Sequence, residues 1–324
     1  MAAILDLIDV RQVGATLTAI TSASIEGTLR AIRSAAAAKG GDGIEFAVIA
    51  LGRYGGGELG FGSDADIVYV HRAVRVDAET ASSVARLIIR ELGRLTEDHR
   101  LPLDLDADLR PEGKNGPLAR SLDAYRAYYG RWSLTWEAQA LLRAHGVAGD
   151  PALCADFLSM ADEIRYPESF SETEVREVRR IKARVENERL PQGADPARHL
   201  KLGRGSLSDV EWYVQLLQLE NARRLPALRT TSTLDALEAA TAAALVDAED
   251  ADELRAAWLL ASRVRSAGTL WTSRTSDVLP TDRRGLEGVA RLLGYPRQSA
   301  SALEQDYLAV TRRARRVFER DFYG

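Results

Sequence analysis

The sequence has little cysteine, little histidine and no excess of positive charge, and each shortage argues against a class of function. The one cysteine, Cys154, cannot form a disulfide within the chain, so a reducing cytoplasm is the expected compartment. The four histidines do not cluster at a metal-ligand spacing, which argues against zinc sites and histidine-based catalytic triads. The formal net charge of −4 gives no basic excess for binding nucleic acid.

Long hydrophobic runs are missing as well. No segment reaches the length that crosses a membrane, and the first residues lack the basic stretch and apolar run of a secretory signal. A chain of 324 residues can hold two modest domains, each with its own core. We therefore expect a cytoplasmic protein whose partner is another protein, with no membrane and no nucleic acid among its ligands.

A glycine-rich turn followed by two aspartates is the most informative feature. Residues 45–51 are apolar and short, as in a buried strand, and residues 52–66 then read GRYGGGELGFGSDAD before a second apolar run begins. Side chains alternate along a strand, so Asp64 and Asp66 should lie on one face. Neighbouring carboxylates repel each other unless a cation lies between them, and carboxylate oxygens suit Mg²⁺ or Mn²⁺. The pattern predicts a nucleotide and metal site.

Glycine turns and exposed aspartates are each common at strand ends, so neither is informative alone. In the order strand, glycine turn, Ser-Asp-x-Asp and strand, they resemble the nucleotidyltransferase superfamily. A dinucleotide-binding fingerprint is disfavoured because no helix directly follows the glycines, and no Gly-Lys-Ser/Thr forms a Walker loop. Ser63 lacks a partner base, so we interpret it as a hydroxyl or backbone donor to phosphate. We interpret the turn from Gly55 to Gly57 likewise, because only glycine lets the backbone approach a phosphate that closely.

Residues 101–111, with the sequence LPLDLDADLRP, supply candidates for a third carboxylate. Aspartates alternate with apolar residues there, which predicts a half-buried strand with Asp104, Asp106 and Asp108 on its polar face. The alternation does not say which aspartate is a ligand. The competing interpretation is a solvated edge strand whose charges prevent pairing with another edge.

Four ordered motifs stand out in the sequence: residues 52–66, residues 106–118 with DADLRPEG and GPL, residues 136–150 with WEAQALLRA and VAGD, and residues 201–212 with KLGRGSLSDVEW. Together they resemble the glutamine synthetase adenylyltransferases, also called adenylyl-ligase/adenylyl-removing enzymes, particularly those of actinobacteria. The sequence departs from the family pattern at two places: Ser206 replaces the usual second glycine of its motif, and residues 145–146 (HG) replace a basic residue and a proline near a helix end.

The resemblance implies a fold and a site. The fold would be α+β, a nucleotidyltransferase (polymerase β-like) mixed sheet with helices, followed by a C-terminal α-helical bundle. Asp64, Asp66 and Asp106 would be the catalytic metal ligands, with Mg²⁺ or Mn²⁺ as the metal and ATP as a substrate. Contacts with the nucleotide are expected from Gly52, Arg53, Gly55, Gly56, Ser63, Arg110, Lys201 and Arg204.

Members of this family carry two homologous halves, one attaching AMP to glutamine synthetase and one removing it by phosphorolysis. This chain has a single Ser-Asp-x-Asp. Residues 58–60 (ELG) resemble the attaching, C-terminal half, in which a tyrosine of glutamine synthetase attacks ATP and pyrophosphate leaves. The ending at residues 322–324 (FYG) resembles the natural end of the actinobacterial proteins. We therefore expect an excised adenylylating half with glutamine synthetase as its partner, and the PII signalling protein as a partner through the full-length enzyme.

Three alternatives stay open at this point. The chain could be the deadenylylating half, which uses the same fold in the opposite direction. It could be a PII-uridylyltransferase relative, which shares the catalytic core and part of the helical element, although the match over residues 136–150 argues against this. It could also be a regulatory module that binds PII or glutamine synthetase without chemistry, which three intact carboxylates argue against.

The sequence also predicts how domains and helices are arranged along the chain. We place a nucleotidyltransferase domain with an N-terminal helix at residues 1–150 and a helical bundle at residues 151–324, with strands expected only up to about Leu118. Trp132 and Trp136 are spaced i, i+4, which predicts one helical face in a core stripe. Lys182 and Glu186 have opposite charges at the same spacing, and we interpret them as a solvated helix face worth a few tenths of a kcal/mol.

Overall fold

The computed structural model describes residues 8–36, 41–96, 103–132 and 135–324. His99 and the first residues of the strand predicted over residues 101–111 lie outside this part of the chain. Contacts divide the chain into two compact units that alternate along the sequence. The sheet unit is the described part of Gly14–Leu59 and Ser63–Pro167, and the helical unit is the described part of Met1–Val13, Gly60–Gly62 and Glu168–Gly324.

A five-stranded mixed sheet forms the centre of the sheet unit. The apolar run at residues 45–51 forms β1, whose two neighbours, β2 and β5, are both antiparallel to it. The other edge of β2 carries two short parallel strands in succession, first β3 and then β4. The strands are β1 (Ile44–Ala50), β2 (Ala65–Ala73), β3 (Leu105–Asp106), β4 (Ala119–Ser121) and β5 (His145–Gly149).

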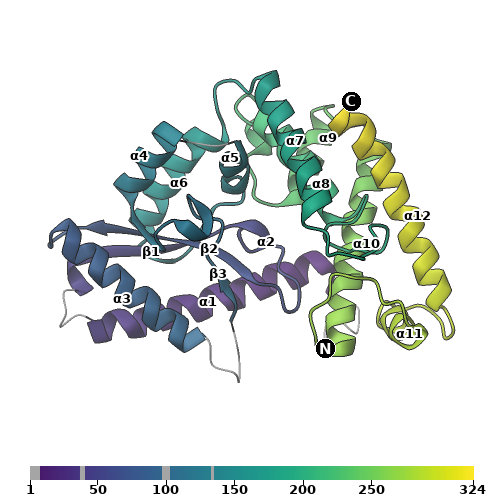
Figure 1. Ribbon diagram of the computed structural model, residues 1–324, viewed down its shortest axis with the longest axis horizontal. Coiled ribbons are helices and arrows are strands. Elements are labelled where there is room, and N and C mark those ends of the chain that lie inside the picture. Colours follow the sequence, from purple (N-terminus) through teal and green to yellow (C-terminus); the bar gives the residue numbers. More distant parts are fainter. Residues whose placement is uncertain (1–7, 37–40, 97–102, 133–134) are drawn as a thin grey trace. The chain divides into compact units, whose positions relative to one another are not determined.

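Helices cover both faces of this sheet (Figure 1). Ile67 and Tyr69 of β2 pack with α1 and α3, whereas Val68 and Val70 pack with α4 and α6 on the opposite face. Alternation therefore places Asp66 on the face of Val68. The helices are α1 (Val10–Ala36), α2 (Gly52–Gly55), α3 (Ala78–Thr96), α4 (Leu122–Trp132), α5 (Thr135–Leu141) and α6 (Pro151–Arg165), with 3₁₀ turns at Gly41–Gly43 and Gly113–Asn115.

The helical unit is built around α10 (Ala248–Thr272), against which the neighbouring helices pack. Trp258, near the middle of α10, is 2% exposed. At the end of the chain, the ring of Phe318 stacks on that of Phe322, with centroids 4.5 Å apart. The other helices are α7 (Glu172–Glu188), α8 (Leu207–Asn221), α9 (Thr233–Ala242), α11 (Arg283–Leu292) and α12 (Ala300–Phe318), with a 3₁₀ turn at Pro226–Leu228 and a π-helical turn at Glu319–Tyr323.

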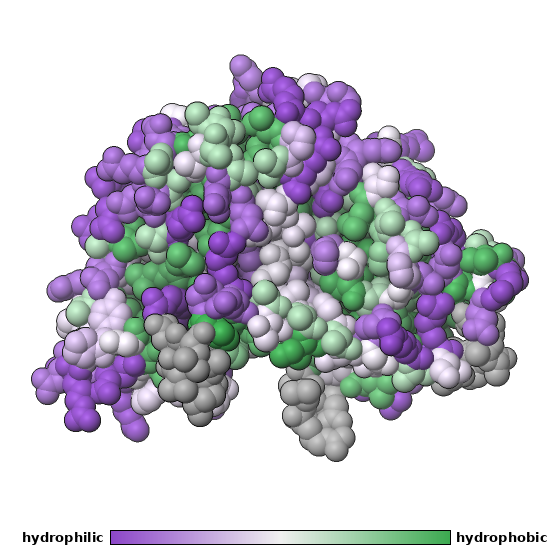
Figure 2. Space-filling model, turned by 180° about the vertical axis from the view of Figure 1, so that it is seen from behind, coloured by the Kyte–Doolittle hydropathy of each residue, from purple (hydrophilic) through white to green (hydrophobic). Residues whose placement is uncertain are grey.

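Hydrophilic side chains predominate on the face shown in Figure 2, where hydrophobic residues form separate patches between them. Among the described residues, no helix combines the length and the apolar character needed to cross a membrane.

The predicted α+β class with a mixed sheet and a helical C-terminal part is confirmed. The prediction that strands end near Leu118 is wrong, because β4 and β5 follow that residue. The sequence of β5, HGVAG, is rich in glycine and alanine and lacks the branched residues that mark a strand. The division at residues 150 and 151 stays a prediction.

The tryptophan stripe predicted for residues 132 and 136 is also wrong. α4 ends at Trp132, whose surface is 60% exposed, and Trp136 belongs to the separate helix α5. The i, i+4 spacing places two side chains on one face only if a single helix contains both. The aromatic core of this region is formed by Tyr125, Tyr129 and Phe157 instead.

Candidate metal and nucleotide site

Three carboxylates meet where β2 begins and β3 ends. Asp64 directly precedes β2, Asp66 is the second residue of β2, and Asp106 lies opposite Asp66 in the parallel register of β3. One carboxylate oxygen from each of these residues lies within 4.8 Å of the other two, and all three residues are half-buried. The register of two parallel strands thus brings together aspartates that are forty residues apart in sequence.

The structure also distinguishes among the three aspartates of residues 101–111. Asp104 is exposed, and its carbonyl accepts the Ala65 amide at 2.8 Å, which anchors β3 to β2. Asp106 ends the strand, and its Oδ1 accepts the Asp108 amide at 2.7 Å. Asp108 pairs with Lys114 at 3.1 Å. The prediction of one strand carrying all three on a common face is wrong, because the chain turns directly after Asp106.

Arg110 holds this turn in place. It is 6% exposed, and its N–H groups donate to the carbonyl oxygens of Ala107 at 2.8 Å, Lys114 at 2.9 Å and Gly116 at 2.9 Å. Three of the five guanidinium N–H groups are therefore used within the loop that follows Asp106. The predicted contact of Arg110 with a nucleotide would have to use the remaining two.

Hydrogen bonds within the glycine-rich turn occupy its own amides. The amide of Gly55 donates to the Leu51 carbonyl at 2.6 Å and that of Gly56 to the Gly52 carbonyl at 3.2 Å, and both glycines are buried. These two amides are therefore engaged within the turn, and the contact of the glycines with a nucleotide stays a prediction. Half-buried Arg53 is tied to the same turn, because its Nε donates to a backbone carbonyl at 3.0 Å.

Close packing requires glycine at positions 52 and 55. Gly52 has φ +50°, and a Cβ on it would lie 2.0 Å from Oδ2 of Asp66. A Cβ on Gly55 would lie 1.8 Å from the carbonyl oxygen of Arg143. The turn therefore contacts the Asp66 carboxylate directly, and only a residue without a side chain leaves that carboxylate in its place.

We expect Gly52→Ala to lower the activity of the site about 10²-fold, because the new methyl group displaces the Asp66 carboxylate by the order of 1 Å. The left-handed backbone also costs an alanine about 1–2 kcal/mol. Gly57→Ala is the matched control, since Gly57 has φ +71° and a Cβ there would have no neighbour within 4 Å. Chemical denaturation should show similar destabilisation in both variants. An equal loss of activity in the control would contradict the steric explanation.

A buried ion pair behind the glycine turn was missed by sequence reasoning. Glu58 and Arg143 pair at 2.8 Å, and their side chains are 7% and 5% exposed. The sequence does contain a sign of this pair, because Glu58 and Arg143 are charged residues in stretches of their motifs that are otherwise uncharged. The pair joins the glycine turn to the segment after α5, and half-buried Ser63 follows five residues later in the same connection to β2.

The second basic motif belongs to the helical unit. Arg204 is exposed and Lys201 is half-buried, and neither side chain forms a hydrogen bond or ion pair with another residue in the described part of the chain. Both lie in the loop of residues 199–206 that leads into α8. Their contact with the nucleotide stays a prediction, as do the nucleotide contacts expected of the other basic residues.

Buried charges fix this loop to the helices around it. Lys182 is 1% exposed and pairs with Asp209 at 2.6 Å and with Glu186 at 3.0 Å. Arg315 of α12 pairs with the same two carboxylates, at 2.9 and 3.0 Å. Asp209 also accepts the Gly205 amide at 2.6 Å. The predicted pair of Lys182 and Glu186 is present, but its placement on a solvated face is wrong.

Ser206 fits the loop although it departs from the family pattern. Its hydroxyl donates to the Leu200 carbonyl and accepts a hydrogen bond from Tyr307 at 3.1 Å, and the residue is completely buried. The serine thus adds a hydrogen bond across the loop that a glycine could not make.

His199 holds the start of the loop in its neutral form. Its Nδ1 accepts the amides of Lys201 and Leu202 at 3.3 and 3.0 Å. Burial lowers the pKa of His199, Lys201 and Arg265 lower it further, and Asp277 opposes them. The lowered pKa keeps Nδ1 unprotonated and able to accept both amides.

This arrangement predicts a pH dependence of stability. Because the pKa of His199 is lower in the folded protein, its contribution is complete above the unfolded value of about 6.5 and declines as pH falls toward the folded value. His199→Asn keeps an acceptor but cannot titrate, so the decline measured by urea unfolding between pH 7.5 and 5 should be smaller in this variant. Buried His71 has the same direction of pKa shift, so the test is the difference between the two curves. Parallel curves would contradict this role.

Comparison with known proteins finds one matching family model for each part of the chain. Residues 1–160 match the family model described as glutamate-ammonia ligase adenylyltransferase. Residues 176–322 match the model described as GlnD PII-uridylyltransferase. The helical part is thus similar to a segment that a related family of enzymes also carries.

Curated relatives resemble the chain over nearly its whole length. A bifunctional glutamine synthetase adenylyltransferase/adenylyl-removing enzyme of Leifsonia xyli is 64% identical over 321 residues, which is 99% of this chain and 32% of the relative. Proteins with the same name from Streptomyces avermitilis and Mycobacterium leprae are 50% and 48% identical over 96% and 99% of the chain, again with 32% of each relative covered. The chain spans about a third of the length of these relatives.

Proposed function

Because this chain belongs to the glutamate-ammonia ligase adenylyltransferase family, we propose that it attaches AMP from ATP to a tyrosine of glutamine synthetase. The observation that carries the proposal is the cluster of Asp64, Asp66 and Asp106 on two parallel strands. Residues 58–60 (ELG) support the attaching direction, because they resemble the attaching half of the family. The specific nucleotidyltransferase fold is part of the same proposal.

The donor set fits a hard divalent cation. Three carboxylates with oxygens within 4.8 Å repel one another unless positive charge compensates them, and all-oxygen ligation suits Mg²⁺ and Mn²⁺. We propose that Asp64, Asp66 and Asp106 hold this metal, which would supply positive charge to the phosphates during displacement of pyrophosphate.

The surrounding residues of the chain keep the ligands in place. The Asp108 amide fixes one oxygen of Asp106, and Gly52 leaves room for the carboxylate of Asp66. The reaction we propose is an in-line attack of the tyrosine hydroxyl on the α-phosphorus of ATP. Lys201 and Arg204 are proposed to bind the triphosphate, because their charges have no partner among the described residues. Binding of a PII protein stays a prediction for the longer members of the family.

The test uses unmodified glutamine synthetase, α-labelled ATP and Mg²⁺, followed by the intact mass of the synthetase subunit. We expect a gain of one AMP per subunit that disappears with Asp64→Asn. If the protein instead only removes AMP from premodified glutamine synthetase when phosphate is added, the proposed direction of the reaction is reversed. If the protein neither attaches nor removes AMP, and also fails to bind ATP in a metal-dependent way in a separate binding measurement, the enzymatic proposal is wrong and a regulatory module is favoured.

A further inference from the structure

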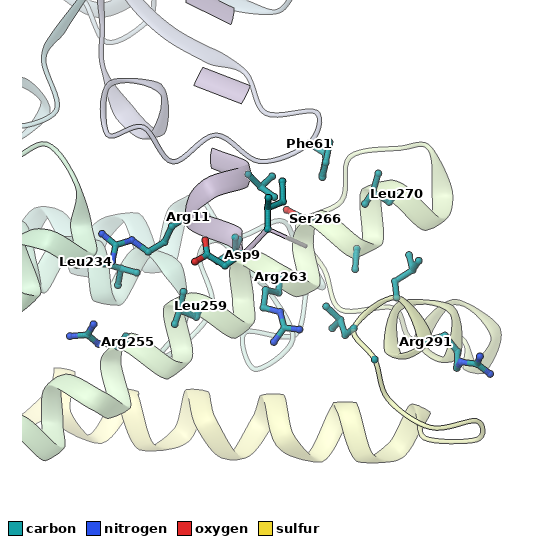
Figure 3. A pocket seen from close by; sticks show the side chains of 17 residues that line it. Asp9, Arg11, Phe61, Leu234, Arg255, Leu259, Arg263, Ser266, Leu270 and Arg291 are labelled. Carbon is teal, nitrogen blue, oxygen red and sulfur yellow. The ribbon is translucent and has the colours of Figure 1, made fainter. Parts of the chain in front are cut away.

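The helical unit contains a cavity of about 490 Å³ that has no part in the proposed reaction. One face of α10 forms its longest wall, where Arg255, Leu259, Arg263, Ser266 and Leu270 follow one another at intervals of three or four residues (Figure 3). The start of α1, the start of α9, the end of α11 and Phe61 complete the lining. A cavity of this volume is within the range of small-molecule sites.

Aliphatic side chains along this wall are incompletely covered. Leu270 is 37% exposed, and Leu259, Leu292 and Leu293 are each half-buried. Leucine is among the residues most often completely buried, and each Å² of apolar surface removed from water contributes about 25 cal/mol. An apolar molecule lying along the wall would therefore be bound by the hydrophobic effect.

Positive charge in the same lining is not balanced. Among the described residues, Arg255, Arg263 and Arg291 have no carboxylate partner, and Nε of Arg255 is buried without a hydrogen-bond acceptor. Arg11, which also lines the cavity, is already paired with Asp235 outside it. A buried donor without an acceptor is unfavourable, which applies to Nε of half-buried Arg255, whereas Arg263 and Arg291 are exposed. A guanidinium binds carboxylates and phosphates through charge-assisted hydrogen bonds.

Asp9 is the single acidic residue of the lining, and its carboxylate accepts the Gln12 amide at 2.8 Å as part of the cap of α1. It therefore does not neutralise the three arginines. Figure 3 shows the labelled arginines spread along the cavity, with Arg255 and Arg291 at different ends and Arg263 between them. This distribution suits an elongated ligand better than a compact anion.

We propose that this cavity binds an anionic amphiphile, a small molecule with an extended apolar body and a carboxylate or similar anionic group. The apolar body lies along Leu259 and Leu270, and the anionic group binds the unpaired guanidinium groups of α10. The cavity shares no lining residue with the carboxylate cluster, so binding of the amphiphile and the proposed nucleotidyl transfer are tested by separate measurements.

Isothermal titration calorimetry with two ligands of equal chain length tests the proposal. Decanoate carries the anionic group, and decan-1-ol is its neutral counterpart. We expect saturable binding of decanoate to one site, at least about tenfold tighter than decan-1-ol, because only the carboxylate engages the arginines. Absence of saturable binding, or equal affinity for both ligands, would overturn the proposal.

Three variants locate the site. Arg263→Met removes one guanidinium and keeps an apolar stem, so decanoate should bind about tenfold more weakly while decan-1-ol is unaffected. Arg184→Met makes the same change at an exposed position of α7 and should leave both affinities unaltered. Ser266→Asp places a carboxylate among the arginines and should abolish decanoate binding without filling the cavity.

Circular dichroism and thermal melting establish that each variant is folded before titration. If Arg184→Met weakens decanoate binding as much as Arg263→Met does, the effect is general electrostatics and the site assignment is wrong. If folded Ser266→Asp still binds decanoate with the original affinity, the ligand lies elsewhere and the proposal fails.

Discussion

Replacing Asp66 by asparagine is expected to lower the rate of the proposed AMP transfer about 10³-fold, which corresponds to about 4 kcal/mol of activation free energy. Asparagine keeps the size of the side chain and one oxygen but removes the charge that would hold a divalent cation. Steady-state transfer of label to glutamine synthetase measures the loss. Asp104→Asn is the matched control, because Asp104 is exposed and contributes its backbone carbonyl to the sheet.

A second measurement separates this role from folding. Without metal, Asp66→Asn should be as stable as the original protein or more so, because it removes repulsion among three carboxylates. Addition of Mg²⁺ should raise the melting temperature of the original protein and of Asp104→Asn, but not that of Asp66→Asn, since a ligand stabilises only the state that binds it. Activity of Asp66→Asn within tenfold of the original would contradict the site.

Removing the carboxylate of Asp209 should give the largest loss of stability. Lys182 is 1% exposed and pairs with Asp209 at 2.6 Å, and Arg315 pairs with the same carboxylate at 2.9 Å. Asp209→Ala leaves Lys182 and Arg315 to share Glu186, with exposed Glu319 as a further partner of Arg315 alone, which we expect to cost about 3–5 kcal/mol. Urea unfolding followed by circular dichroism and tryptophan fluorescence measures this cost.

The double variant distinguishes charge from packing. Lys182→Met removes the buried ammonium and keeps a similar apolar stem, so adding it to Asp209→Ala should recover part of the stability. Asp252→Ala, an exposed position of α10, is the control and should change stability by no more than about 0.5 kcal/mol. If the two losses simply add in the double variant, the buried charges are not coupled and the explanation is wrong.

The parts of the site that the sequence revealed are those set by local pattern. Alternation at the start of an apolar run placed Asp64 and Asp66 on one face, and the glycines marked the end of β1. The third carboxylate needed more than alternation, because residues 104, 106 and 108 are equivalent in that pattern. Asp106 differs from the other two because the parallel register of β2 and β3 places it opposite Asp66, and that register depends on backbone hydrogen bonds with β2.

Burial of charged residues was the main source of error. Lys182 reads as a solvent-exposed cation, yet it is buried and paired within the fold. A helix with opposite charges at i, i+4 has the same sequence pattern whether that face meets water or another helix. The partners that decide the matter, such as Asp209 and Arg315 for Lys182, are far away in sequence.

The two short strands on the outer edge of β2 amount to one strand in two pieces. β3 pairs at Ala65 and Asp66, β4 resumes at Tyr69 in the same direction, and residues 107–118 form an excursion between them. The first piece is held by its own hydrogen bonds, so the excursion can gain or lose residues without a register slip that would turn Asp106 to the other face. Natural variation in the length of this excursion should therefore leave the face of Asp106 unchanged, provided that the Asp108 amide and the Arg110 hydrogen bonds that hold the turn are kept.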